Sequence, residues 1–156
     1  MRLLFTCVAL LLTASASAKT THHRAPAPVD YVYIVNTGSF DIPGYRVYLG
    51  SNEKLSAAYL PRTGRHGSRR TGSLAPLVTR RIFADLKQAY PINALPQEAG
   101  LNTNLSSTAP EVRIYLVYHN RQSPDLRNAA STAGKTLYQD VKQAIQAVRM
   151  PVPNVP

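Results

Sequence analysis

Arginine and tyrosine recur together in two segments of the chain, in a pattern that suits binding of an anion. Residues 45–49 read YRVYL and residues 112–118 read VRIYLVY, so each segment carries an arginine two positions before a tyrosine. A guanidinium forms paired hydrogen bonds to a carboxylate or phosphate, and a tyrosine ring offers a flat stacking surface. A histidine directly follows the second segment. The candidate ligand-binding residues of these segments are Arg46, Tyr48, Arg113, Tyr115 and His119.

A second candidate anion site is the stretch PRTGRHGSRRTG at residues 61–72, which has no apolar side chain apart from proline. The composition predicts a long loop, and loops of this length are usually functional or disordered. It precedes an expected helix, whose N-terminal N–H groups attract anions. The alternative is a solvated loop without a ligand. The candidate ligand-binding residues of this loop are Arg62, Arg65, Arg69 and Arg70.

The same stretch argues against nucleotides and nucleic acids as partners. It does not match the G-x-x-x-x-G-K-[ST] pattern that cradles nucleotide phosphates. It also lacks the interleaved aromatic residues on which single-stranded bases stack. We therefore expect an anionic polymer or another protein as the partner.

Catalysis and metal binding have little support in the residue pattern. His119, Ser123 and Asp125 could supply a base, a nucleophile and an orienting acid, but Ser-Pro-Asp is also ordinary turn composition. No G-x-S-x-G nucleophile motif occurs. The four histidines are dispersed at positions 22, 23, 66 and 119, and the single cysteine is Cys7. We expect no catalytic residues, no metal site and no cofactor.

The overall charge also favours an acidic partner. The chain has 18 lysine and arginine residues against 8 aspartate and glutamate residues, for a net charge of +10, and 13 of the basic residues are arginine. Such a charge promotes binding to polyanions. A basic balance is also common among exported proteins, so the charge alone does not identify a ligand.

The first eighteen residues predict a cleaved secretory signal peptide. A short positive start precedes the apolar run Leu3 to Leu12, and the small residues Ala14 to Ala18 supply a cleavage site. The run is shorter than the ~20 apolar residues of a membrane span, and no later stretch reaches that length. Cleavage would remove Cys7, so the mature chain would have no disulfide. We expect a periplasmic or extracellular protein that does not span the membrane.

Hydrophobic periodicity predicts the elements that would position the candidate residues. Alternation predicts strands, and apolar stripes spaced three and four residues apart predict helices. The expected fold is a single α+β domain over residues 30–150, between a disordered tail at 19–29 and a proline-rich tail at 151–156. It is a two-layer sandwich in the order βββαβα, with two helices on one face of an antiparallel sheet of about four strands. The expected strands span 31–35, 45–49, 54–60 and 112–118, and the expected helices span 77–90 and 137–148.

Side-chain alternation predicts that aromatic and cationic residues share the face of the sheet away from the helices. Their partner could be an anionic ligand, but tyrosine is also a good cross-strand residue, and the face could bury against a second copy. We expect a non-catalytic binding domain, with a protein-interaction domain (an enzyme inhibitor or a homodimer subunit) as the alternative and a hydrolase as the third hypothesis. The residues predicted on this face are Tyr31, Tyr33, Arg46, Tyr48, Arg113, Tyr115 and His119.

Overall fold

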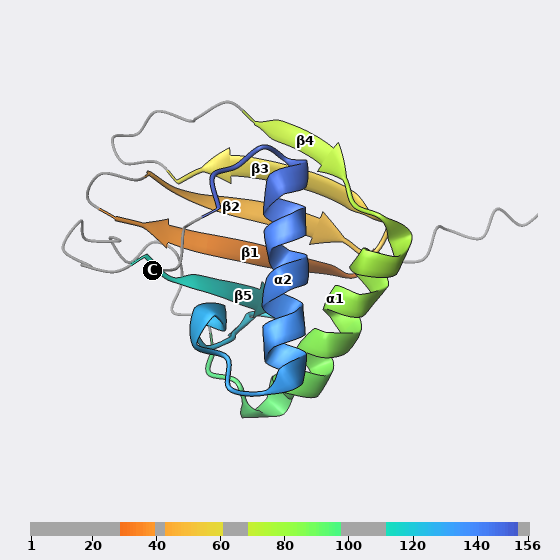
Figure 1. The fold of residues 1–156 in the computed structure, drawn as a ribbon, viewed down its shortest axis with the longest axis vertical. Helices are drawn as coiled ribbons and strands as arrows, with labels where there is room; N and C mark the ends of the chain where they lie inside the picture. The colour runs from red at the N-terminus through yellow and green to blue at the C-terminus, as the bar shows by residue number, and fades with distance from the viewer. Residues whose placement is uncertain (1–28, 40–42, 61–68, 98–111, 153–156) are drawn as a thin grey trace, which may run out of the picture.

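The computed structural model describes residues 29–39, 43–60, 69–97 and 112–152, which form a six-stranded antiparallel sheet with two helices on one face (Figure 1). The strand order across the sheet is β4-β3-β2-β1-β5-β6. No helix among these residues is long and apolar enough to cross a membrane. The predicted signal peptide at 1–18 lies outside the described residues, and so do residues 19–28 and 153–156 of the two predicted tails. The elements are β1 (Tyr31–Gly38), β2 (Pro43–Gly50), β3 (Lys54–Tyr59), β4 (Arg70–Ser73), α1 (Pro76–Ala89), η1 (Ile92–Ala94), β5 (Ile114–Tyr118), β6 (Arg121–Gln122), η2 (Leu126–Asn128) and α2 (Thr132–Ala147).

One hydrophobic core fills the space between the sheet and the helices, as the alternation of the strands predicts. The aliphatic side chains of β1, β2 and β5 that were expected to face the helices are all buried in this core. The expected stripe of α2 is buried along its whole length. In α1 the stripe is shorter, because Leu77 at its start is 67% exposed. The core residues from the strands are Val32, Ile34, Tyr45, Val47, Leu49, Leu55, Ala57, Ile114, Leu116 and Tyr118, and those from the α2 stripe are Leu137, Val141, Ala144, Ile145 and Val148.

The sheet has six strands rather than the predicted four, because β4 and β6 were not expected. β4 reads RTGS and contains no apolar side chain, so its pattern resembles a loop. It becomes a strand by pairing with β3, and Gly72 lets it approach the end of α2: a Cβ at this position would lie 2.9 Å from the carbonyl oxygen of Ala147. The prediction that residues 61–72 are all loop is therefore wrong for residues 70–72. The observed order is ββββαββα, apart from the two short 3-10 helices.

An ion pair with one buried partner joins α1 to α2. The side chain of Asp140 on α2 is only 1% exposed, and the guanidinium of Arg81 on α1 donates to both carboxylate oxygens at 2.5 Å. Charge-assisted bonds with this two-pronged geometry are strong and directional. The pair therefore sets the position of the two helices relative to each other.

Candidate binding face of the sheet

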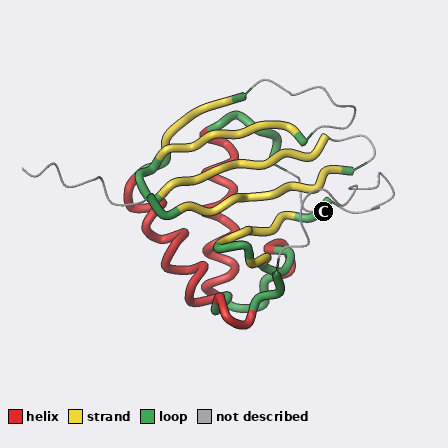
Figure 2. The backbone as a smooth tube through the Cα atoms, turned by 180° about the vertical axis from the view of Figure 1, so that it is seen from behind, coloured by secondary structure: helices red, strands yellow, loops and turns green. Residues whose placement is uncertain are grey.

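The face of the sheet away from the helices is turned toward the viewer in Figure 2, and strand alternation places the predicted residues Arg46, Tyr48 and Tyr115 on it. The strand register places Tyr33 of β1 opposite Tyr48 of β2, and Tyr48 opposite Ser56 of β3. The neighbouring row places Val35 opposite Arg46. Because side chains directly opposite each other point to the same face, the two rows form one continuous surface.

Three tyrosine rings on this face touch one another. The ring centroids of Tyr31 and Tyr48 lie 5.5 Å apart in a stacked arrangement. Tyr33 meets Tyr31 at 5.4 Å and Tyr48 at 5.8 Å, edge to face in both cases. Tyr31 is 45% exposed, and the other two rings are half-buried. The cluster is thus a preformed aromatic surface in contact with solvent.

Arg46 adds a positive charge directly to this cluster. Its guanidinium carbon lies 4.5 Å from the centroid of the Tyr33 ring, within the range of a cation–π interaction. Stacking holds a guanidinium in place while its N–H groups can still meet an acidic oxygen at its edge. We call Tyr31, Tyr33, Arg46 and Tyr48 the tyrosine–arginine face.

Further cations surround the tyrosine–arginine face. Arg69 donates from its Nε to the Oγ of Ser56 at 2.6 Å, which draws it to the row of Tyr48. Lys54 lies two residues before Ser56 on the same face of β3. Arg113 is opposite Thr37, whose Oγ1 accepts from the Arg113 backbone N–H at 2.9 Å. None of the strand residues described on this face is acidic.

Tyr115 lies on the predicted face but is almost fully buried there. It packs with Val35 and Val117 in a second small cluster, against which Tyr33 also lies. Its exposed fraction is 7%. Tyr115 therefore packs beside the tyrosine–arginine face and contributes little to its exposed surface.

His119 and Arg70 lie away from the tyrosine–arginine face. The alternation of β5 ends at Tyr118, and His119 enters the following turn with φ 49°, placing its Nε2 3.5 Å from a carboxylate oxygen of Asp30. Arg70 sits over the ring of Tyr59 on the helix side and donates to the carbonyl oxygen of Arg149. Arg69 and Arg70 point to opposite faces because they are adjacent in an extended segment. The candidates Arg62 and Arg65 lie outside the described residues.

The side chains of His119, Ser123 and Asp125 do not form a catalytic triad with one another. The Oγ of Ser123 accepts from the Leu116 backbone N–H at 2.9 Å and donates to the Pro124 carbonyl oxygen at 2.9 Å. The carboxylate of Asp125 instead binds the guanidinium of Arg127 at 2.7 Å. Of the three described candidates, no two hydrogen bond to each other, so they do not act as nucleophile, base and orienting group.

The pKa of Asp125 reflects its structural role. Burial raises the pKa, but hydrogen bonds from the side chain and backbone of Arg127 and from the Ile114 backbone N–H together lower it below its usual value. Asp125 also caps η2. The charged form is thus the one that the fold stabilises, which suits a structural acceptor.

Asp30 is a structural residue that the residue pattern did not single out. One of its oxygens accepts from the hydroxyl of Tyr118 at 2.5 Å, and the other accepts from the Tyr31 backbone N–H at 3.0 Å. Burial and the bond to Asp30 raise the pKa of Tyr118 to about 12. These contacts anchor the start of β1, and with it the ring of Tyr31. The local sequence does not indicate the role of Asp30, because its partner Tyr118 on β5 is far away in the chain.

Neither a metal centre nor a known relative identifies the site. The described part of the chain holds no group of three or more histidine, cysteine, aspartate or glutamate side chains placed to bind a metal ion. The chain matches no protein-family model, and no curated protein matches it either. The case for a function therefore depends on the chemistry of the tyrosine–arginine face.

Proposed function

We propose that this protein is an exported, non-catalytic binding domain that engages an anionic partner through its tyrosine–arginine face. The observation that carries the proposal is the guanidinium of Arg46, 4.5 Å from the ring of Tyr33 within a cluster of three tyrosines. The rings can stack on sugar or other planar units, while the arginine pairs with acidic groups. The partner class is an anionic polymer of the envelope or the extracellular space.

Two further features support this assignment. The face carries cations from β2 and β3 and from the segments beside β4 and β5, so a long polyanion could contact several of them at once. Both helices pack on the other side of the sheet, as Figure 2 shows. Export follows from the predicted signal peptide at residues 1–18.

The test is binding of the mature protein to lipopolysaccharide, polyphosphate, a sulfated glycan and DNA over a salt series. We expect tight, salt-sensitive binding to one of the first three, because multiple phosphate or sulfate contacts release counterions. The double variant Arg46→Gln/Arg113→Gln should weaken it at least tenfold.

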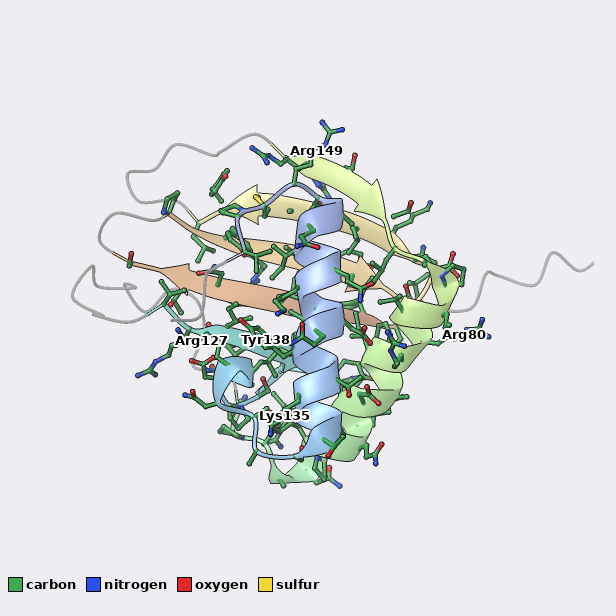
Figure 3. The ribbon with its side chains drawn as sticks, viewed as in Figure 1. Arg80, Arg127, Lys135, Tyr138 and Arg149 are labelled. Atoms are coloured by element: carbon green, nitrogen blue, oxygen red, sulfur yellow. The ribbon has the colours of Figure 1, made fainter. Side chains whose placement is uncertain are left out.

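The matched control is Arg80→Gln/Lys135→Gln, which removes the same charge from the helix layer (Figure 3). If both double variants bind equally well, or if both lose binding equally, the site on the sheet is wrong. Thermal melts of all three proteins exclude loss of folding as the cause.

A protein-interaction domain remains the second candidate, because three tyrosine rings and Arg46 form one cluster in which Tyr31 is 45% exposed. Tyrosine and arginine are also the residues that dominate protein interfaces. Such an interface would resist salt and fail on Tyr48→Ala, whereas polyanion binding would weaken with salt. The salt series therefore separates the two candidates.

A further inference from the structure

The outer edge of β4 carries backbone groups that no described strand pairs with. β4 is the last strand of the sheet on this side, next to β3 only. The Leu74 backbone N–H donates to the Glu53 carbonyl oxygen at 3.0 Å, and Glu53 lies directly opposite Leu74 in the register of the two strands. This bond fixes which residues of β4 point their N–H and C=O groups toward β3.

Hydrogen-bonded and non-hydrogen-bonded pairs alternate along antiparallel strands. Counting back from Leu74, Gly72 and Arg70 turn their backbone groups toward β3, and Thr71 and Ser73 turn theirs outward. Thr71 and Ser73 are exposed to solvent, whereas Arg70 and Gly72 are partly buried. β4 thus presents two outward N–H groups and two outward C=O groups at strand spacing.

The side chains around this edge are mainly cationic, on both faces of the sheet. Lys54 and Arg69 lie on the tyrosine–arginine side, with Lys54 opposite Ser73. Arg70 lies on the helix side and donates to the backbone of Arg149, at the end of α2 beside β4 (Figure 3). The four cations are Lys54, Arg69, Arg70 and Arg149, and the acidic residue described near them is Glu53, in the turn before β3.

We propose that β4 accepts an extended peptide rich in aspartate and glutamate, which adds to the sheet as a seventh strand. Peptides that add to a sheet edge gain affinity from main-chain bonds and specificity from flanking side chains. The cations on either side of β4 attract acidic side chains from both faces of the added strand. They also disfavour a second copy of this basic chain at the same edge. This interaction is separate from the proposed polyanion binding, because it needs neither Arg46 nor Tyr48.

The probes are three capped eight-residue peptides of alternating Glu–Val, Glu–Pro and Lys–Val, titrated into the ¹⁵N-labelled protein at one salt concentration. We expect Glu–Val to shift the amide signals of Thr71 and Ser73 and to slow their hydrogen exchange. Glu–Pro keeps the charge but cannot form a ladder, and Lys–Val reverses the charge, so both should bind at least tenfold more weakly. Equal binding of Glu–Val and Glu–Pro would reduce the interaction to charge alone and overturn the proposal.

The decisive variant is Thr71→Pro, which removes an outward N–H while leaving the bonds to β3 in place. Its matched control, Thr71→Val, keeps the N–H. We expect Thr71→Pro to lose Glu–Val binding at least tenfold and Thr71→Val to keep it.

Unchanged binding by Thr71→Pro, or self-association of the wild type through β4 in sedimentation, would refute the proposal. If Thr71→Pro fails to fold, the exchange rates of the wild-type amides decide the question. Arg46→Gln/Arg113→Gln should bind Glu–Val normally, so the two proposals can fail independently.

Discussion

At the scale of single residues, the fold already uses several of the charged groups that the sequence offers as ligands. Arg70 binds the end of α2, and Arg127 and Asp125 hold each other. His119 lies beside Asp30. The sequence does not separate these residues from the other candidates, because residue type does not reveal which partner the fold brings near. The hydrogen bonds and ion pairs of the fold therefore rule out candidate functional residues that amino-acid composition alone cannot rule out.

The ion pair between the helices should respond unequally to loss of its two members. Arg81→Ala leaves the buried carboxylate of Asp140 without its guanidinium, whereas Asp140→Asn keeps an acceptor oxygen for Arg81, which is 42% exposed. Removing one partner of a buried charge is costly because the other stays unpaired in a low dielectric. We expect Arg81→Ala to lower the melting temperature clearly more than Asp140→Asn, as thermal melts at pH 7 would show. The opposite order would show that an unpaired Asp140 carboxylate is not costly at this position, and it would contradict the prediction.

Tyr45 should make the protein lose stability at alkaline pH. Burial raises its pKa to about 12, and its hydroxyl donates to the Pro151 carbonyl oxygen at 2.6 Å. The contribution is complete below the unfolded pKa of about 10 and is lost as the pH rises toward 12, because the unfolded chain releases the proton first. We expect the free energy of unfolding to fall by up to about 1.4 kcal/mol per pH unit in this window.

The variant Tyr45→Phe should flatten that alkaline decline, although Tyr118 would retain part of it. At pH 7 it should cost about 1 kcal/mol through the lost hydrogen bond. Urea denaturation between pH 7 and pH 12 measures both effects. Equal alkaline slopes in the variant and the wild type would contradict the assignment to Tyr45.

At the scale of elements, hydrophobic periodicity predicts the helices and strands that are stabilised by packing of apolar side chains. It misses strands that are stabilised by backbone pairing alone. The stripe of α2 and the alternation of β1 follow directly from apolar residues that must leave water. β4 has no such residues, and it becomes a strand only through β3 and the end of α2. The tyrosine–arginine face was predictable because alternation fixes faces, but the burial of Tyr115 and the turn at His119 were not.

Gly72 should be required for β4 to lie against α2. A Cβ at this position would meet the Ala147 carbonyl oxygen at 2.9 Å, and this oxygen belongs to the backbone and cannot turn aside. We expect Gly72→Ala to destabilise the protein by about 1–3 kcal/mol, the usual cost of overpacking. Hydrogen exchange should quicken at the Arg70 and Gly72 amides and stay unchanged in β1. Uniform exchange changes over the whole sheet would show that β4 does not move alone.

At the scale of the whole molecule, two binding surfaces are proposed on one layer, and the two helices cover the other side of that layer. The tyrosine–arginine face uses side chains and charge, and the edge of β4 uses backbone groups flanked by charge. Lys54 and Arg69 lie close to both, whereas Arg46 and Tyr48 belong to the face alone. A polymer on the face and a peptide at the edge could therefore be bound at the same time.

Export should leave this architecture unchanged, because the described fold begins at Val29. In a secreting bacterial host we expect the signal peptide to be cleaved after Ala18, so that the mature chain starts at Lys19, as intact-mass measurement of exported protein would show. The double variant Ala16→Leu/Ala18→Leu replaces the small residues that the peptidase needs and should retain the uncleaved form. Both forms should show the same hydrogen-exchange protection in β1 and α2. A chain that stays in the cytoplasm at full length would refute export, and with it the expected envelope or extracellular source of the anionic partner.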